Sequence, residues 1–142
     1  MIGSINAEEC KKSALHGGEN LTKKELIDCC LAYPAVYEDY PFDETTALIR
    51  HSGNKKVFAL VDYLYGRLQI TLKCDPFKAD FLRQIHKNII PGYHMNKEHW
   101  NTVYMDEGDI SYDELSDMIQ HSYDLTKPKI KVRNKERIEK NT

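Results

Sequence analysis

The chain has 142 residues, 41% of them hydrophobic and 30% charged, with a formal net charge of -2. This length and composition fit one soluble domain with a conventional core, and no apolar stretch approaches the roughly 20 residues that a membrane-spanning helix needs. The N-terminus lacks a basic region followed by an apolar block, so we expect a cytoplasmic protein with no secretion signal and no membrane partner.

The first predicted helix follows a stretch without a regular pattern of polar and apolar residues. Residues 1–20 contain scattered polar groups and glycines, and we interpret them as an N-terminal extension. Thr22 and Glu25 have the spacing of a capping box, in which each side chain binds the backbone N–H of the other residue. A helix is therefore predicted to begin there and to end before Pro34.

Three strands are predicted next. Residues 46–51 form the first, and a tight turn at 52–55 leads into 57–61, which is apolar throughout and suits a central strand. After a turn at Gly66, apolar and polar residues alternate over 68–74. The polar positions of this third strand are Gln69, Thr71 and Lys73. One face of the strand is therefore expected to join the core and the other to meet solvent.

A second helix is predicted to begin at Asp75 and Pro76. Aspartate is a favoured N-cap, and proline is tolerated at the first helical position because its missing N–H would be unpaired there in any case. The helix is expected to run to about Lys87. Its buried face is predicted to consist of apolar residues at helical spacing: Phe77, Phe81, Leu82 and Ile85.

A fourth strand and a third helix complete the predicted domain. Residues 100–105 are typical of a strand, and Ser111 and Glu114 repeat the capping-box spacing. The inward face of the third helix is expected to comprise Leu115, Met118, Ile119 and Ser122. This order predicts an α+β fold over residues 21–127, with an antiparallel sheet of about four strands packed with three helices in two layers.

The charge is distributed unevenly along the chain. Residues 127–142 hold seven basic and two acidic groups, a local charge of +5, which leaves 13 of the 20 basic and 20 of the 22 acidic residues for the first 126, a charge of -7. An acidic body disfavours strong nonspecific binding of nucleic acid, because phosphate neutralisation drives such binding. The basic tail, residues 128–142, could still supply that attraction locally.

The cysteines favour a structural role. They are Cys10, Cys29, Cys30 and Cys74, and they show no C-x-x-C spacing. We therefore expect reduced thiols that pack in the core of a cytoplasmic protein. Thiolate catalysis is the less favoured alternative.

Residues 91–104 concentrate hydrogen-bonding and stacking side chains. They include two histidines, one lysine, two asparagines, two tyrosines and the only tryptophan of the chain. Together with Lys73, which leaves a strand face nearby, these groups could hold phosphates and stack on a base. In the alternative interpretation, Trp100 and Tyr93 belong to the core and the polar groups satisfy loop amides.

Nothing else in the chain defines a reaction. The common hydrolase, zinc-protease and nucleotide signatures are absent from the sequence. His94 and His99 would be about 140° apart on a helix and could not both bind one metal ion there. No third ligand has a fixed spacing to them, so the pair does not predict a metal site. Carboxylates at Asp39, Asp43 and Glu44 could act as acid and base, but a solvated turn is favoured there. We predict no catalytic residue, no metal and no cofactor.

Four segments carry a family resemblance. In chain order they are EDYPFD at 38–43, LKCDP at 72–76, PGYHMNKEHWNTV at 91–103 and HSYDL at 121–125. In this order and spacing they resemble the bacterial MmcQ/YjbR family over about 21–127. The resemblance implies a small cytoplasmic α+β protein related to the double-wing domain of a phage transcription factor, and it implies DNA binding.

We therefore predict a monomeric, non-enzymatic DNA-binding module, for which a regulatory role is one option. The residues expected to contact nucleic acid are Lys55, Lys56, Arg67, Lys73, His94, Asn96, Lys97, His99, Trp100, Asn101, Lys129, Lys131 and Arg133. Acidic groups on the third helix disfavour its insertion into a DNA groove, so strands or wings would make the contact. Two alternatives stay open. One is a small-molecule binding protein or enzyme with a pocket between the segments 91–103 and 38–43, and the other is a protein-interaction module.

Overall fold

The computed structural model describes residues 21–92, 95–106 and 110–129. The expected N-terminal extension, His94, Lys131 and Arg133 lie outside the described residues. Within the described ranges, no helix is long and apolar enough to cross a bilayer.

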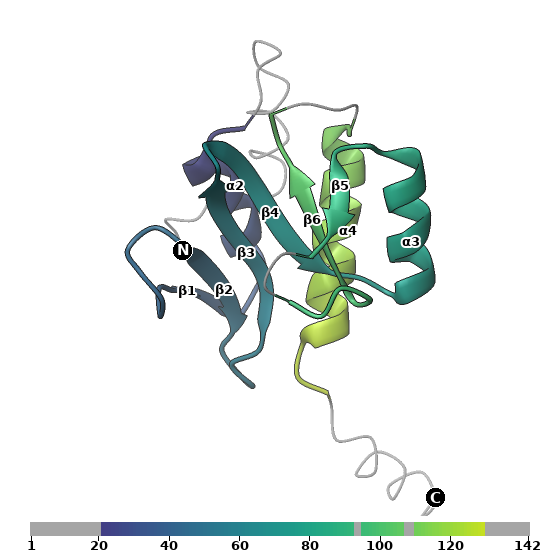
Figure 1. Cartoon of the computed structure of the whole chain (residues 1–142). Coiled ribbons are helices and arrows are strands. Elements are labelled where there is room, and N and C mark those ends of the chain that lie inside the picture. Colours follow the sequence, from purple (N-terminus) through teal and green to yellow (C-terminus); the bar gives the residue numbers. More distant parts are fainter. Residues whose placement is uncertain (1–20, 93–94, 107–109, 130–142) are drawn as a thin grey trace, which may run out of the picture.

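The described chain forms a six-stranded antiparallel sheet with helices (Figure 1). The helices are α2 (Lys23–Leu31), α3 (Pro76–Ile85) and α4 (Tyr112–Thr126); the strands are β1 (Val36–Asp39), β2 (Ala47–His51), β3 (Val57–Leu64), β4 (Arg67–Lys73), β5 (Ile89–Pro91) and β6 (Trp100–Tyr104). The strand order is β1-β2-β3-β4-β6-β5, and every neighbouring pair is antiparallel. The predicted α+β class is confirmed.

The predicted number of strands is wrong, because the sheet has six rather than about four. The two additional strands, β1 and β5, are the edge strands and have only four and three residues. Segments this short carry almost no alternation of polar and apolar residues. They are strands because β1 pairs with β2 and β5 pairs with β6, in each case across an intervening loop.

The local helix signals are confirmed. Both capping boxes are present, at Thr22 with Glu25 and at Ser111 with Glu114. The side chain of Asp75 accepts a hydrogen bond from the backbone N–H of Lys78 at the start of α3. Each cap satisfies a backbone N–H that has no partner within its own helix.

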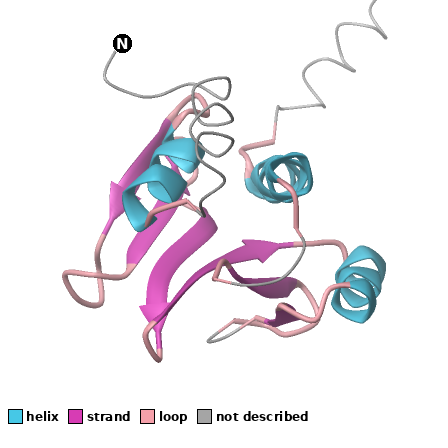
Figure 2. Cartoon of the chain, turned by 90° about the horizontal axis from the view of Figure 1, so that it is seen from above, coloured by secondary structure: helices cyan, strands magenta, loops and turns pink. Residues whose placement is uncertain are grey.

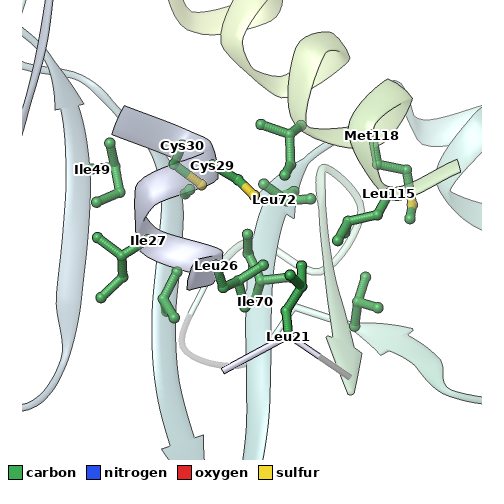
Figure 3. Packing of buried hydrophobic residues seen from close by; sticks show 14 of the residues in the cluster. Leu21, Leu26, Ile27, Cys29, Cys30, Ile49, Ile70, Leu72, Leu115 and Met118 are labelled. Carbon is green, nitrogen blue, oxygen red and sulfur yellow. The ribbon is translucent and has the colours of Figure 1, made fainter. Parts of the chain in front are cut away.

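The helices lie on one face of the sheet, and the main core lies between them and the strands (Figure 2). Leu26 and Cys30 of α2 pack with Ile49, Ile70 and other strand residues, and α4 adds its apolar face (Figure 3). The inward face predicted for α4 is confirmed, since Leu115, Met118, Ile119 and Ser122 are all buried. We call the opposite side of the sheet the open face.

The buried face predicted for α3 is largely wrong. Phe77, Phe81 and Ile85 are 88%, 58% and 50% exposed, whereas Ala79 is buried and Leu82 packs against the core. Two stripes of this helix satisfy the 3.6-residue period, so spacing alone could not choose between them. The helix packs beside β5 and β6, and the stripe with the small residue Ala79 allows the close approach.

The cysteines have different states. Cys30 and Cys74 are free and buried, as expected. Burial raises the pKa of Cys30 to about 12, so this thiol stays protonated at neutral pH. The expectation of reduced thiols is wrong for Cys29, which is disulfide-bonded. Sequence spacing could not reveal that bond, because disulfide pairing depends on the tertiary structure.

Candidate binding site on the open face of the sheet

The open face of β4 is buried, although its polar residues were expected to meet solvent. Gln69 is 2% exposed and Thr71 is fully buried. Thr71 is the cross-strand partner of Thr102 on β6, and their hydroxyl oxygens lie 2.8 Å apart. The helices cover the other face, so other parts of the chain must shield these side chains.

A pocket of about 680 Å³ lies on this face. Its apolar lining is Phe42, Leu48, Val57, Leu60, Leu64 and Met95, and its polar lining is Asp43, Thr46, Arg50, Asp62 and Gln69. We call it the sheet pocket. Its volume is in the range of small-molecule sites, about 300 to 1,000 Å³. Its mainly apolar lining with a few polar groups is also typical of such sites.

Two loops that are far apart in sequence meet at the sheet pocket. Phe42 and Asp43 belong to the EDYPFD segment, and Met95 belongs to the PGYHMNKEHWNTV segment. The small-molecule alternative required these segments to approach each other. The structure therefore supplies the geometry on which that alternative depended.

A hydrogen-bonded turn holds Asp43 at the rim of the pocket. Its Oδ1 accepts hydrogen bonds from the backbone N–H groups of Thr46, at 2.7 Å, and Thr45, at 2.9 Å. These bonds hold the pKa of Asp43 below its usual value, with the Thr46 N–H as the largest cause. Asp43 is therefore ionised at neutral pH, in the kind of hydrogen-bonded turn that the sequence favoured.

One hydroxyl connects two carboxylates in the pocket. The Oγ1 of Thr46 lies 3.2 Å from the Oδ2 of Asp43 and 2.8 Å from the Oδ2 of Asp62. A threonine hydroxyl has a single proton to donate. At any moment one of these two carboxylate oxygens therefore lacks a donor from Thr46.

Gln69 brings an unpaired acceptor to the same place. Its Oε1 is buried and has no hydrogen-bond partner among the described residues. Gln69 is the direct cross-strand partner of Asp62, so both side chains leave the sheet on the open face. A buried polar atom without a partner costs about 1 to 3 kcal/mol. A ligand that donates a hydrogen bond to this oxygen would recover that free energy.

The cation of the sheet pocket already has partners. The Nε of Arg50 donates to the Oδ2 of Asp39 at 2.7 Å, and its Nη1 donates to the carbonyl of Lys55 at 2.8 Å. The Arg50–Asp39 pair joins β2 to the edge strand β1. The positive charge of Arg50 is therefore largely balanced before any ligand binds.

Several residues predicted to contact nucleic acid have structural partners instead. Arg67 makes two hydrogen bonds to Asp106, at 2.8 and 3.0 Å, and its guanidinium lies 3.8 Å from the centre of the Tyr104 ring. Asn101 is buried on the helix-covered face, where it accepts from Arg83 at 2.6 Å and donates to the carbonyl of Ala79 at 3.3 Å. Asn101 thus has no surface to offer to a nucleic acid.

The described part of the 91–104 run mostly holds its own loop together. Lys97 donates to the carbonyl of Gly92 at 3.2 Å and accepts a hydrogen bond from Arg83 at its own carbonyl. The Oδ1 of Asn96 accepts from the backbone N–H of Glu98, and the carbonyl of half-buried His99 accepts from the backbone N–H of Cys74. These contacts agree with the alternative in which the polar groups satisfy loop amides.

Trp100 is 9% exposed and sits beside Lys73, its cross-strand partner. The backbone N–H of Gly92 donates to the carbonyl of Trp100 at 2.7 Å, and a Cβ at Gly92 would lie only 2.6 Å from the Cβ of Trp100. Glycine is required by this close approach. Trp100 therefore belongs mainly to the packing, while Lys73 remains half-buried.

Three of the lysines predicted to contact nucleic acid lie at one end of the molecule. Lys55 and Lys56, on the turn between β2 and β3, are exposed, and so is Lys129. The Nδ2 of Asn54 donates to the carbonyl of Thr126 at 2.9 Å, which places this turn against the C-terminal end of α4. The start of the basic tail therefore lies beside the two lysines of the turn.

Sequence reasoning missed the polar groups of the sheet pocket, namely Thr46, Asp62 and Gln69. The polar positions of alternating strands were interpreted as solvent-facing, which is the usual outcome for a two-layer fold. One signal in the sequence could have indicated that this face is buried. The polar side chains on the neighbouring strands are uncharged: the amide of Gln69 and the hydroxyls of Thr71 and Thr102. Uncharged polar side chains tolerate burial far better than charged ones.

Comparison with known proteins identifies relatives of this chain. The YjbR family model matches residues 31–125. The Bacillus subtilis protein YyaQ is 37% identical over 75% of this chain and 99% of its own length, and Escherichia coli YbdF is 38% identical over 89% and 96%; both are described as uncharacterised. The crystal structure of Deinococcus radiodurans DR2400 is similar, with a TM-score of 0.68 and 35% identity, over 81% of this chain and 86% of that one.

Proposed function

The chain belongs to the YjbR family, and we propose from its geometry that it is a non-enzymatic module that binds a small molecule in the sheet pocket. One observation carries this proposal: Gln69 lines a pocket of about 680 Å³, and its buried Oε1 has no hydrogen-bond partner in the described part of the chain. A protein interior keeps few such unpaired acceptors. An acceptor of this kind in a site of ligand size is best explained by a donor that arrives with the ligand.

The lining of the sheet pocket supports binding rather than catalysis. It contains no serine, cysteine, histidine, lysine or tyrosine, so the usual nucleophiles and most proton-transfer groups are missing from its described walls. Asp43 is ionised well below neutral pH and would be a poor proton donor there. The guanidinium of Arg50 is held by its hydrogen bond to Asp39.

Nuclear magnetic resonance of the full chain tests this proposal. A set of fragment-sized molecules should shift the backbone resonances of Asp43 and Gln69 and leave α4 unchanged. The variant Leu64→Trp places a large ring in the pocket wall and should abolish these shifts. Tyr65→Trp is the matched control, because Tyr65 is 84% exposed and does not line the pocket. Fragments that bind both variants equally well, or bind elsewhere only, would contradict the proposal.

DNA binding is the second candidate, and one contact favours it. The hydrogen bond from Asn54 to Thr126 holds the turn with Lys55 and Lys56 beside Lys129, where the basic tail begins. Three lysines at one end of an acidic protein could hold a phosphate backbone. Binding by this end would be weak, tolerant of sequence and strongly dependent on salt.

A salt titration on duplex DNA tests the second candidate. The double variant Lys55→Gln/Lys56→Gln should weaken binding for all sequences and reduce the slope against log salt by about 2. Lys78→Gln/Lys87→Gln makes the same charge change at two exposed positions, one on α3 and one two residues after its end, and should have little effect. If both variants weaken binding equally, only the net charge matters and this end of the molecule has no special role.

A further inference from the structure

We propose that the ligand of the sheet pocket carries a protonated amine on an apolar body, an inference that rests on the proposed function above. The inference depends on the arrangement of three acceptors and on the lack of a free donor near them in the described part of the chain. Asp43, Asp62 and Gln69 all line the pocket, and the one hydroxyl in its described lining belongs to Thr46.

The acceptors are close enough to share one donor group. The Oδ2 atoms of Asp43 and Asp62 both lie within 3.2 Å of the Thr46 Oγ1. Asp62 and Gln69 are directly opposite on β3 and β4, which places their Cβ atoms about 4.5 to 5.5 Å apart. A single group with several protons could therefore reach both carboxylates and the Gln69 carbonyl oxygen.

The charge of the pocket favours a cation. Two carboxylates line it, and Arg50, the one cation among the lining residues that the structure describes, is already paired with Asp39. Lys23 approaches this region, but its ammonium donates to the carbonyl of Thr45 and it does not line the pocket. A ligand carboxylate would meet like charges and would offer Gln69 Oε1 a second acceptor instead of a donor.

An ammonium group matches these acceptors better than a hydroxyl does. It has three donors and no acceptor, whereas a hydroxyl has one donor. Hydrogen bonds between an ammonium and a carboxylate are also stronger than those between neutral groups. The remaining walls are aliphatic and aromatic, from Leu48, Leu60 and Phe42 among others, so the rest of the ligand is expected to be an alkyl or aryl group.

Three six-carbon probes with the same alkyl chain test the inference on the full-length protein. They are hexylamine, 1-hexanol and hexanoate, which are a cation, a neutral molecule and an anion at neutral pH. Dissociation constants are measured from the shifts of the Asp43 and Gln69 resonances. We expect hexylamine to bind at least about tenfold more tightly than 1-hexanol, a difference of about 1.4 kcal/mol, and hexanoate to bind weakest.

Variants separate the amine contacts from general effects of charge. Asp62→Asn keeps the shape of the side chain and should lower the affinity ratio of hexylamine to 1-hexanol about tenfold. Asp117→Asn removes the same charge from an exposed position on α4 and should leave that ratio unchanged. Thermal melts of both variants show whether they remain folded.

The outcomes distinguish this inference from the proposed function. Equal binding of the three probes in the pocket, or tightest binding of hexanoate, would overturn the amine assignment and leave the small-molecule function standing. Pocket binding by other fragments but by none of the three probes would also overturn it. If neither the fragment set nor the probes shift the pocket resonances, both proposals fail.

Discussion

Asp62 on β3 and Gln69 on β4 are direct cross-strand partners on the open face of the sheet, and no residue that the structure describes donates a hydrogen bond to the buried Oε1 of Gln69. Asp62 accepts from the Thr46 hydroxyl and from the backbone N–H of Tyr63, whereas no described group donates to the Gln69 oxygen. Such an arrangement lowers the stability of the free protein. In the proposed function, the ligand compensates for this cost.

Gln69→Leu should leave the free energy of unfolding unchanged or raise it by about 1 kcal/mol, because it removes a buried acceptor that has no partner among the described residues. Thr71→Val is the matched control on the same strand face. It should lower the free energy of unfolding by about 1 to 3 kcal/mol, because it removes the buried hydrogen bond between the hydroxyls of Thr71 and Thr102 at 2.8 Å. Urea denaturation measures both. A loss in Gln69→Leu as large as that in Thr71→Val would show that the Gln69 carbonyl is satisfied.

Ser122→Ala should destabilise the protein by about 1 to 3 kcal/mol. The buried Oγ of Ser122 donates to the carbonyl of Phe58 at 2.6 Å and accepts from the backbone N–H of Lys73 at 2.9 Å, so it connects α4 to two strands. Ser116→Ala, on a half-buried position of α4, should change the stability by no more than about 0.5 kcal/mol. Similar values for the two variants in urea denaturation would refute the role given to Ser122.

The free energy of unfolding should fall as the pH drops below about 6.5. His51 is buried, its Nε2 lies 2.8 Å from the Oγ1 of Thr126, and burial lowers its pKa. The unfolded chain then binds a proton at the ordinary histidine pKa while the folded protein resists it. The contribution of His51 is complete above pH 6.5 and is lost as the pH falls through the lower folded-state pKa.

Denaturation by urea at several pH values between 8 and about 5.5 measures this effect. His51→Gln should make the free energy of unfolding depend less steeply on pH. His121→Gln should have the same effect, because burial also lowers the pKa of half-buried His121. Unchanged slopes in both variants would assign the pH dependence to other groups.

Phe77→Ala should change the stability by no more than about 0.5 kcal/mol, since its side chain is 88% exposed. Phe58→Ala removes the same side chain from a fully buried position beside His51 and Tyr123, and should cost about 3 to 5 kcal/mol. Thermal and urea denaturation compare the two. A large loss in Phe77→Ala would mean that the apolar stripe of α3 is covered in solution.

The sequence by itself determined the features that depend on neighbouring residues. The capping boxes of α2 and α4 and the N-cap of α3 connect groups only three residues apart, so spacing was sufficient. The inward face of α4 also followed, because one apolar stripe on that helix has no competitor. The family was recognisable from short segments of fixed order, and the match over residues 31–125 confirms it.

Tertiary structure alone decided which of several equivalent surfaces became buried. The apolar stripe of α3 was predicted to face the core, but packing at the sheet edge chose the stripe with Ala79. Alternation on β4 showed that Gln69 and Thr71 share a face, yet only the approach of two distant loops placed Gln69 in a pocket with Phe42, Asp43 and Met95. Such contacts join residues far apart in the chain, and no local period or spacing records them.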